Sequence, residues 1–363
     1  MSPSALERGA LWALAWPLLA LLAGLYGALG ALRRHAYRRG WLRTERAACP
    51  VLSVGNLTAG GSGKTPLVDW LLRAAAQAGC RPVAISRGYR NRSAADVIRC
   101  RAAEGLPPDP VAMGDEPALL ARRNPDVPVY VARRRALAAR LAALRDRPGL
   151  IVLDDGFQHL RLARALDVVL IDGQAGLGNG RLLPLGPLRE PLRAARRAHA
   201  VLIAKAEPEE AEPLRARIAA ALGGTVPVFT SAYRPAALRR LDGGPELPLE
   251  ALRGRAVHAL CGIARPQGFV QTLAALGARV ERLHAHADHF AYPEPALRAL
   301  EAALDADIEA AAGPRWVATE KDAVKLAGRL AGAERLWVLE MAVYPDPAAQ
   351  AFFFDFIARC TIE

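Results

Sequence analysis

A glycine-rich turn between an apolar run and a helical pattern carries the strongest chemical signal in the chain. Residues 51–54 (VLSV) are apolar, and residues 58–65 (TAGGSGKT) follow them closely. Glycines let backbone N–H groups converge on an anion, and the first turn of a helix adds partial positive charge. Lys64 can reach the β- and γ-phosphates of a nucleotide, and the Thr65 hydroxyl can ligate Mg²⁺. The pattern predicts a phosphate-binding loop of the Walker A type.

The loop departs from the usual G-x-x-x-x-G-K-[ST] pattern at its first position, where this chain has threonine. The two adjacent glycines in the middle of the loop can supply the flexibility instead. A glycine-rich turn that binds nothing is the alternative, but the lysine, the threonine and both flanking elements disfavour it. We expect nucleotide contacts from the whole loop: Thr58, Ala59, Gly60, Gly61, Ser62, Gly63, Lys64 and Thr65.

Two adjacent acids end the cleanest buried strand pattern. Residues 150–153 (LIVL) are apolar, and Asp154 and Asp155 follow directly. This is the Walker B arrangement, in which an acid at a strand end holds Mg²⁺. Burying two aspartates without a cation is costly, which favours a metal site over a purely structural role. We therefore predict Thr65, Asp154 and Asp155 as metal ligands.

Two further segments carry groups suited to proton transfer. Asp115 and Glu116 stand just before a helical pattern, where capping of the helix by Asp115 is the alternative. Residues 284–289 (HAHADH) combine histidines with an aspartate, but their spacing does not match a zinc site. A His beside an Asp is a plausible proton-transfer pair, with solvated loop histidines as the alternative.

Candidate substrate-contacting residues lie in loops. Residues 176–190 (GLGNGRLLPLGPLRE) form a glycine- and proline-rich loop without clear periodicity, and long loops inside a domain are usually functional. The candidates are Arg181, Arg189 and Glu190 in that loop, Gln158 after the acid pair, and Arg133 in an arginine triplet.

Lysine is rare in this chain, and that rarity carries information. Of 48 basic Lys and Arg residues, four are lysines. Arginine is used elsewhere, so a lysine marks a position that needs a compact, flexible ammonium. Lys64 meets that expectation, Lys205 ends a strand pattern, and Lys321 and Lys325 become suspects.

Apolar strand patterns alternate with helical stretches along most of the chain, which predicts a doubly wound, mostly parallel α/β sheet of the P-loop NTPase type. Composition shifts to proline, glycine and charge near residues 233–254, and a second αβ series follows. We expect residues 45–232 to form the P-loop domain and residues 233–363 a smaller α/β lobe. Residues 1–44 form an N-terminal membrane-associated segment.

That N-terminal segment contains residues 9–32 without a charge, enough for a helix of about 36 Å. Five arginines follow within residues 33–43, which predicts that the remainder stays cytoplasmic. A cleaved signal peptide fits less well, because the apolar run is long and the arginines lie on its C-terminal side. The helix either spans the bilayer or lies in its interface, and a buried helix of a soluble fold is the alternative.

The net charge of +12 does not indicate a nucleic-acid binder. Aromatic residues make up 6% of the chain, whereas binding of single strands needs aromatic side chains among the basic ones. The five cysteines show no metal-ligand spacing, which predicts reduced thiols in a cytosolic compartment.

Taken together and in order, these blocks resemble the tetraacyldisaccharide 4′-kinase family of lipid A biosynthesis. The matching segments are VGNLTAGGSGKTP, SRGYR, GDEP, LDDGFQH, GNGRLLPLGPLRE, CGIARPQGF, ADHFAY and TEKDAVK. The resemblance implies phosphorylation of the 4′-hydroxyl of a tetraacylated, monophosphorylated glucosamine disaccharide, with ATP and Mg²⁺. It also implies two αβα lobes with the active site in the cleft between them, and no obligate protein partner. The enzyme would work at the cytoplasmic face of the bacterial inner membrane.

By motif position the resemblance implies an Asp–His pair made of Asp115 and His289. We expect Asp115, tuned by His289, to accept the hydroxyl proton, and Arg133 or Lys321 to offset phosphate charge. The main rival is a membrane-associated P-loop GTPase or transport ATPase, because the late TEKD segment loosely resembles the guanine-reading N-K-x-D. Glutamate in place of its asparagine weakens that reading.

Overall fold

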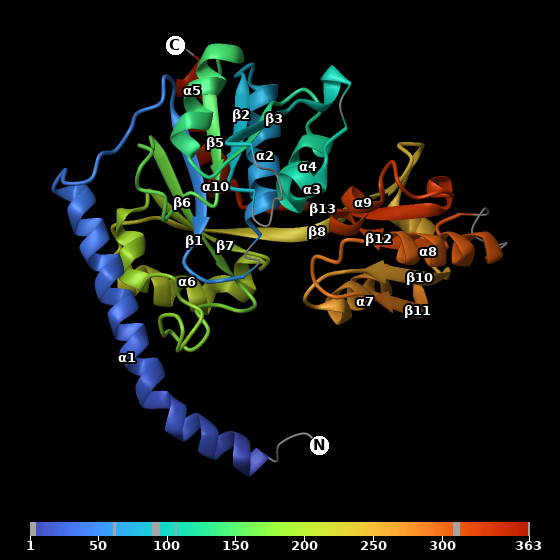
Figure 1. Cartoon of the computed structure of the whole chain (residues 1–363), viewed down its shortest axis with the longest axis horizontal. Helices are drawn as coiled ribbons and strands as arrows, with labels where there is room; N and C mark the ends of the chain where they lie inside the picture. The colour runs from blue at the N-terminus through green and yellow to red at the C-terminus, as the bar shows by residue number, and fades with distance from the viewer. Residues whose placement is uncertain (1–4, 61–62, 89–94, 106, 308–312, 362–363) are drawn as a thin grey trace. The chain divides into compact units, whose positions relative to one another are not determined.

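The computed structural model describes residues 5–60, 63–88, 95–105, 107–307 and 313–361 (Figure 1). The chain forms two compact units. The first contains residues 1–87, 132–232 and 344–363, and the second contains residues 88–131 and 233–343. The domain limits expected from composition stay a prediction.

The first unit is built on a parallel sheet in the order β7-β6-β1-β5-β2. Its strands are β1 (Val51–Asn56), β2 (Pro82–Ser86), β5 (Leu150–Asp154), β6 (Leu166–Asp172) and β7 (Ala200–Ala204). Every residue of these five strands is buried. Strands covered on both faces read as continuous apolar runs, which is why their sequences lack alternation. The start of β8 (Val228–Arg240) extends this sheet beside β7.

Helices cover the sheet of the first unit. They are α2 (Lys64–Gln77), α5 (Arg135–Arg145), α6 (Pro208–Leu222) and α10 (Pro347–Thr361), with a 3₁₀ turn at Leu192–Arg197. Helix α2 packs on β1, β2 and β5, and α10 packs on α2. Because neighbouring strands in this sheet are parallel, each connection crosses over the sheet, and the order shows that β1 and β2 lie on either side of β5, as in a doubly wound fold.

The second unit has a parallel sheet in the order β11-β10-β12-β13. Its strands are β10 (Ala256–Cys261), β11 (Arg279–Ala285), β12 (Trp316–Thr319) and β13 (Leu336–Pro345). Around them lie α7 (Pro266–Ala275), α8 (Glu294–Ala306) and α9 (Glu320–Leu326). The apolar faces of α8 and α9 pack with Trp316 and Leu336 into one core cluster.

An earlier segment of the chain also belongs to the second unit. It contains β3 (Val97–Cys100), α3 (Pro110–Met113), α4 (Asp115–Arg123) and all but the last residue of β4 (Val129–Ala132). Later in the chain, the short strand β9 (Glu246–Leu247) pairs antiparallel with β8. Helix α4 packs against α9, although the two are about two hundred residues apart in sequence. The observed architecture confirms the predicted mostly parallel α/β fold.

Helix α1 (Ala5–Arg38) is drawn in blue in Figure 1. Its stretch Trp16–Arg38 is long and apolar enough to cross a membrane, judged by length and composition. Its large apolar side chains are exposed, with Leu21 at 69%. That exposure is incompatible with a buried helix of a soluble core.

Candidate active site

The phosphate loop connects the end of β1 at Asn56 to the start of α2 at Lys64. Gly60 and Gly63 have φ angles of 115° and 82°, which residues with a side chain rarely adopt. The first turn of α2 therefore begins at a sharp bend, with Thr65 buried beneath it. Gly61 and Ser62, also predicted to bind the nucleotide, lie outside the described residues.

The first half of the loop is held by backbone pairing with residues 187–189. Ala59 N donates to Pro187 O at 2.7 Å, and Arg189 N donates to Leu57 O at 2.6 Å. Gln158 Nε2 donates to Asn56 O at 3.0 Å. The Ala59 N–H is thus already bonded to a carbonyl of the protein. The backbone N–H groups from Gly63 onward are therefore better placed to bind an anion. Gln158 and the 176–190 loop support the phosphate loop directly.

The two acids predicted after β5 have different surroundings. Asp154 is 1% exposed and accepts a hydrogen bond from Ser86 Oγ at 3.1 Å. Asp155 lies 3.6 Å from Lys64 Nζ through Oδ1. Arg189 Nη1 donates to the two carboxylate oxygens of Asp155 at 3.1 and 3.2 Å. The structure therefore brings together three residues that the sequence predicted separately: Lys64, Asp155 and Arg189.

Electrostatics keep Asp155 ionised. Burial raises the pKa of Asp155, but the charges of Lys64, Arg189 and Arg135 outweigh burial and place the pKa below its usual value. The residue also has a φ of 51°, an uncommon conformation for a side-chain-bearing residue. Strained backbone at a charged cluster is typical of functional sites.

Arg135 is a charged residue at this site that the sequence analysis missed. It opens α5 and is 4% exposed, whereas Arg133 of the same triplet is exposed. Burial lowers the pKa of Arg135. The negative charges of Asp155 and Asp154 raise it, but by less than burial lowers it. Helical spacing could have indicated its burial. Arg135 lies at i in a series whose other members, at i+3, i+4 and i+7, are alanines, and all four residues are buried on one face of α5.

Arg181 and Glu190 connect the 176–190 loop to α1. Glu190 is buried and accepts from Arg34 Nη1 at 3.0 Å and from Arg197 Nη1 at 2.8 Å. The Arg181 guanidinium lies over the Trp16 ring, 5.4 Å from its centroid. Their positions explain how the N-terminal helix is attached, and substrate contact by either residue stays a prediction.

In the second unit the structure brings Asp115 and His289 together. Asp115 Oδ2 lies 2.9 Å from His289 Nδ1 and 3.1 Å from Lys325 Nζ. His289 has a φ of 63°, and its Nε2 lies 3.8 Å from Asp288 Oδ2. Asp115 is the first residue of α4 and not its cap, which is Gly114. The capping and solvated-loop alternatives are therefore both wrong for this pair.

Asp322 organises the backbone around that pair. Its buried carboxylate accepts from Gly262 N at 2.9 Å, from Tyr292 Oη at 3.0 Å and from Thr319 Oγ1. His289 N in turn donates to Gly262 O at 3.3 Å. Burial and the charge of Asp322 raise the pKa of Tyr292. The carboxylate of Asp322, the aspartate of the TEKD segment, is thus engaged in hydrogen bonds within the protein. This disfavours the interpretation of TEKD as a guanine-binding motif.

A family model described as tetraacyldisaccharide-1-P 4′-kinase matches residues 15–358. The chain belongs to this kinase family. The tetraacyldisaccharide 4′-kinase of Anaeromyxobacter sp. (strain K) is 47% identical over 341 residues, which cover 92% of this chain and 88% of that protein. The protein of the same name from Syntrophus aciditrophicus is 38% identical over 339 residues, covering 91% and 90%.

A solved structure of a kinase in this family resembles the chain throughout. It is the crystal structure of the "apo" form of LpxK from Aquifex aeolicus in complex with ATP. The TM-score is 0.75 at 28% identity, with 97% of this chain and 99% of that chain covered. The expected family, fold and kinase activity are confirmed, and the roles of individual site residues stay predictions.

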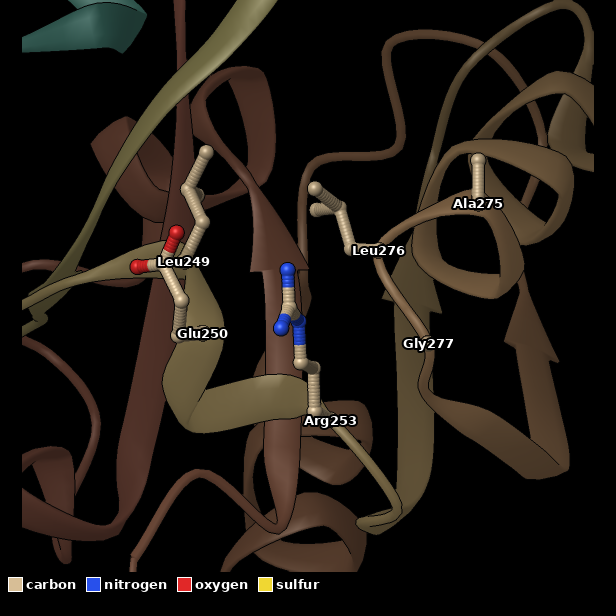
Figure 2. A pocket seen from close by; sticks show the side chains of 6 residues that line it. All are labelled: Leu249, Glu250, Arg253, Ala275, Leu276 and Gly277. Atoms are coloured by element: carbon tan, nitrogen blue, oxygen red, sulfur yellow. The ribbon is translucent and has the colours of Figure 1, made fainter.

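A separate pocket of about 290 Å³ in the second unit of the kinase lies away from these residues. Figure 2 shows the Arg253 side chain between Glu250 and Leu276, with Leu249, Ala275 and Gly277 around them. These residues precede β10 and β11, at the amino ends of the parallel strands. Ligands of open α/β sheets bind at the carboxyl ends, where Gly262 and Asp322 lie, so we assign this pocket no role in catalysis.

Proposed function

We propose that this chain transfers the γ-phosphoryl group of ATP to the 4′-hydroxyl of a tetraacylated glucosamine disaccharide 1-phosphate. The observation that carries the proposal is the family match over residues 15–358. Each unit, taken by itself, contains groups suited to such a transfer: the first has a phosphate loop, an acid pair and cations, and the second has a candidate proton acceptor.

The first unit supplies the groups for the nucleotide phosphates. Lys64 and Arg189 contact Asp155, and Arg135 adds a buried positive charge beside it. Phosphoryl transfer relies on positioning and charge neutralisation more than on covalent chemistry by the protein. We assign Lys64 to the β- and γ-phosphates, with the α2 N-terminus as a further anion-binding element.

The residues present fit a magnesium ion. Thr65, Asp154 and Asp155 offer a hydroxyl and carboxylate oxygens, which are the hard ligands that Mg²⁺ prefers. Within the described ranges no set of three or more His, Cys, Asp or Glu side chains gathers into a closed metal site. The remaining ligands would come from the nucleotide and water, as is usual for this ion. When bound, it would neutralise phosphate charge.

The second unit supplies the pair that we assign to proton transfer. An ionised carboxylate only accepts hydrogen bonds, so His289 Nδ1 donates to Asp115 Oδ2. The same Asp115 oxygen also lies 3.1 Å from Lys325 Nζ, so the ion pair and the imidazole share it. In place of the acceptor expected from the sequence, Asp115, we therefore infer that His289 Nε2 takes the 4′-hydroxyl proton and that Asp115 orients the imidazole.

The N-terminal helix supports action at a membrane. Its exposed apolar side chains are followed by Trp41, which is 70% exposed, and by exposed arginines at residues 38, 39 and 43. Arginines at such a position attract anionic lipid headgroups by about 1 kcal/mol each. We infer attachment to the cytoplasmic face of the bacterial inner membrane, where an acylated disaccharide is accessible.

One assay tests the proposal. The purified full chain, in detergent micelles with Mg²⁺ and radiolabelled ATP, should label a tetraacyldisaccharide 1-phosphate only when the lipid is added. The Lys64→Ala variant should lose the transfer. If lipid stays unlabelled while GTP or ATP is hydrolysed without acceptor, the rival GTPase or transport ATPase reading replaces this one.

A further inference from the structure

Lys325 is a buried cation whose partner is the proposed proton-transfer pair. It lies on α9, is 4% exposed, and its Nζ is 3.1 Å from Asp115 Oδ2. In the part of the chain that the structure describes, this ammonium makes no hydrogen bond of normal geometry. A buried ammonium is costly unless it is paired, so its position in the fold depends on Asp115.

The packing of α4 on α9 sets the distance between the two charges. Arg123 Nη2 lies 2.7 Å from Glu320 Oε1, and Arg122 Nη1 donates to Ala323 O at 3.4 Å. Both contacts join the end of α4 to α9, on which Lys325 also lies. The ion pair between Asp115 and Lys325 is therefore built into two packed helices and not into mobile loops.

The choice of lysine also points to a specific requirement. This chain uses arginine at almost every basic position, and Lys325 is one of four lysines. An ammonium is a compact point charge, whereas a guanidinium is a planar fork that tends to engage a carboxylate through two bonds. A compact cation can hold Asp115 Oδ2 and still leave that oxygen accessible to His289 Nδ1.

We propose that Lys325 is the positioning residue of the proton-transfer pair, an inference that rests on the proposed kinase function. Lys325 holds Asp115 Oδ2 toward His289 Nδ1, and the imidazole then presents Nε2 as the proton acceptor. Among the described residues, the imidazole contacts the charged groups Asp115 from α4 and Asp288 from the segment after β11, and Lys325 from α9 contacts Asp115.

The decisive variant is Lys325→Met, which keeps much of the volume and removes the charge. We expect kcat for transfer to the lipid to fall by about 10²-fold, within the range for general base catalysis. The KM values for ATP and lipid should stay within about threefold, because the residue acts in the transition state and not in ground-state binding. A kcat near the wild-type value in folded Lys325→Met overturns the proposal.

The pH profile separates this role from a structural one. Because a nearby cation disfavours uptake of a proton, removing it should move the acidic limb of kcat against pH to higher pH. Lys325→Arg keeps the charge and should keep the limb near the wild-type position. An acidic limb that stays in place in Lys325→Met, at any level of activity, contradicts the inference.

A double-mutant cycle completes the test and avoids an unpaired buried charge. Lys325→Met in an Asp115→Asn background should lower kcat little further, because the lysine acts through Asp115. A further loss of about 10²-fold would assign Lys325 a direct contact with the substrate and overturn the positioning role.

Arg298→Met, which removes an exposed cation from α8 in the same unit, is the matched control and should change neither kcat nor the acidic limb of the pH profile. If the wild-type chain itself does not label the lipid, the proposed function has failed, whereas loss confined to Lys325 variants concerns this inference alone.

Discussion

Arg34 in α1 donates from Nη1 to Glu190 Oε2 at 3.0 Å. Glu190 directly follows Arg189, which contacts Asp155, so one short segment connects the N-terminal helix and the acid pair. Arg197 Nη2 and Nη1 hold the same carboxylate at 2.8 Å each. Helix α1 is thereby joined to the segment beside the acid pair by side-chain bonds as well as by the chain.

Replacing Glu190 should weaken that attachment. In Glu190→Gln both arginines lose a charged acceptor, and hydrogen bonds to charged groups are worth about 1.5–3 kcal/mol each. We expect a lower free energy of unfolding in urea and faster tryptic cleavage at the arginines after α1. Arg34→Met also removes the bond to α1 and should speed cleavage similarly, but it should lower the free energy of unfolding less, because Arg197 still pairs with Glu190. Equal protease resistance in Glu190→Gln and wild type would refute the attachment.

The pair of Asp115 and His289 gives a direct prediction on catalysis. Asp115→Ala and His289→Ala should each lower kcat by about 10²–10⁴-fold, because a positioned base contributes that factor. The combined variant should be scarcely slower than either one, since the two residues act as a unit. Steady-state transfer assays with circular dichroism as a folding check measure this. Near-wild-type turnover in both single variants would defeat the assignment.

Much of the fold follows from the sequence because buried parallel strands have a simple signature. The apolar runs beginning at Val51, Leu150 and Val257 appear as β1, β5 and β10. In contrast, β8 crosses the region whose composition looked like a boundary. It contains Pro235 and several arginines, and its burial does not alternate regularly. When buried and exposed residues occur on both faces of a strand, the sequence shows no alternation of apolar and polar residues from which the strand could be predicted.

The site was only partly predictable for a similar reason. Lys64, Thr65 and the acid pair lie in local motifs, where neighbours in sequence are neighbours in space. Arg135 and Asp322 act through contacts formed by distant segments, such as Asp322 with Gly262. Lys325 stood out through the scarcity of lysine, yet its partner Asp115 is 210 residues away in numbering (325 − 115). Composition indicates that a residue is unusual, but only packing indicates what it contacts.

Asp322 should prove essential for the geometry around His289. Asp322→Asn keeps the shape but turns one acceptor oxygen into a donor facing other donors, among them Gly262 N and Tyr292 Oη. A displacement of about 1 Å at a reacting group can cost about 10²-fold, so we expect kcat to fall by that order. Tyr292→Phe removes one donor and should cost about 0.5–1.5 kcal/mol of stability. Unchanged kcat in Asp322→Asn would contradict this.

A histidine pair in the second unit should make stability depend on pH. His284 Nε2 lies 3.3 Å from His258 Nδ1, and both rings pack on Trp316. Burial, with the charges of His258 and Arg282, lowers the pKa of His284 to about 4. The unfolded chain therefore binds the proton first as pH falls below about 6.5, and stability declines from there toward pH 4.

The variant that tests this dependence is His284→Phe, which retains an aromatic ring against Trp316. The urea midpoint should fall less between pH 7.5 and pH 5 in His284→Phe than in wild type, because one group that takes up a proton on unfolding is gone. Above pH 7 the two proteins should respond to pH alike. Parallel declines below pH 6.5 would show that another group controls acid stability.

Arg135 provides the last prediction, which concerns the charge balance of the acid pair. Arg135→Met leaves Asp154 and Asp155 with one fewer buried cation, and removing one partner of a buried charge cluster costs about 3–5 kcal/mol. A bound metal and nucleotide would offset part of that cost, so Mg²⁺ with ATP should raise Tm more in Arg135→Met than in wild type. Arg134→Met, at the exposed neighbouring position, is the control and should show the wild-type shift. A ligand-induced shift in Arg135→Met no larger than that of the control would mean that Arg135 does not compensate the acids, and that Lys64 and Arg189 suffice.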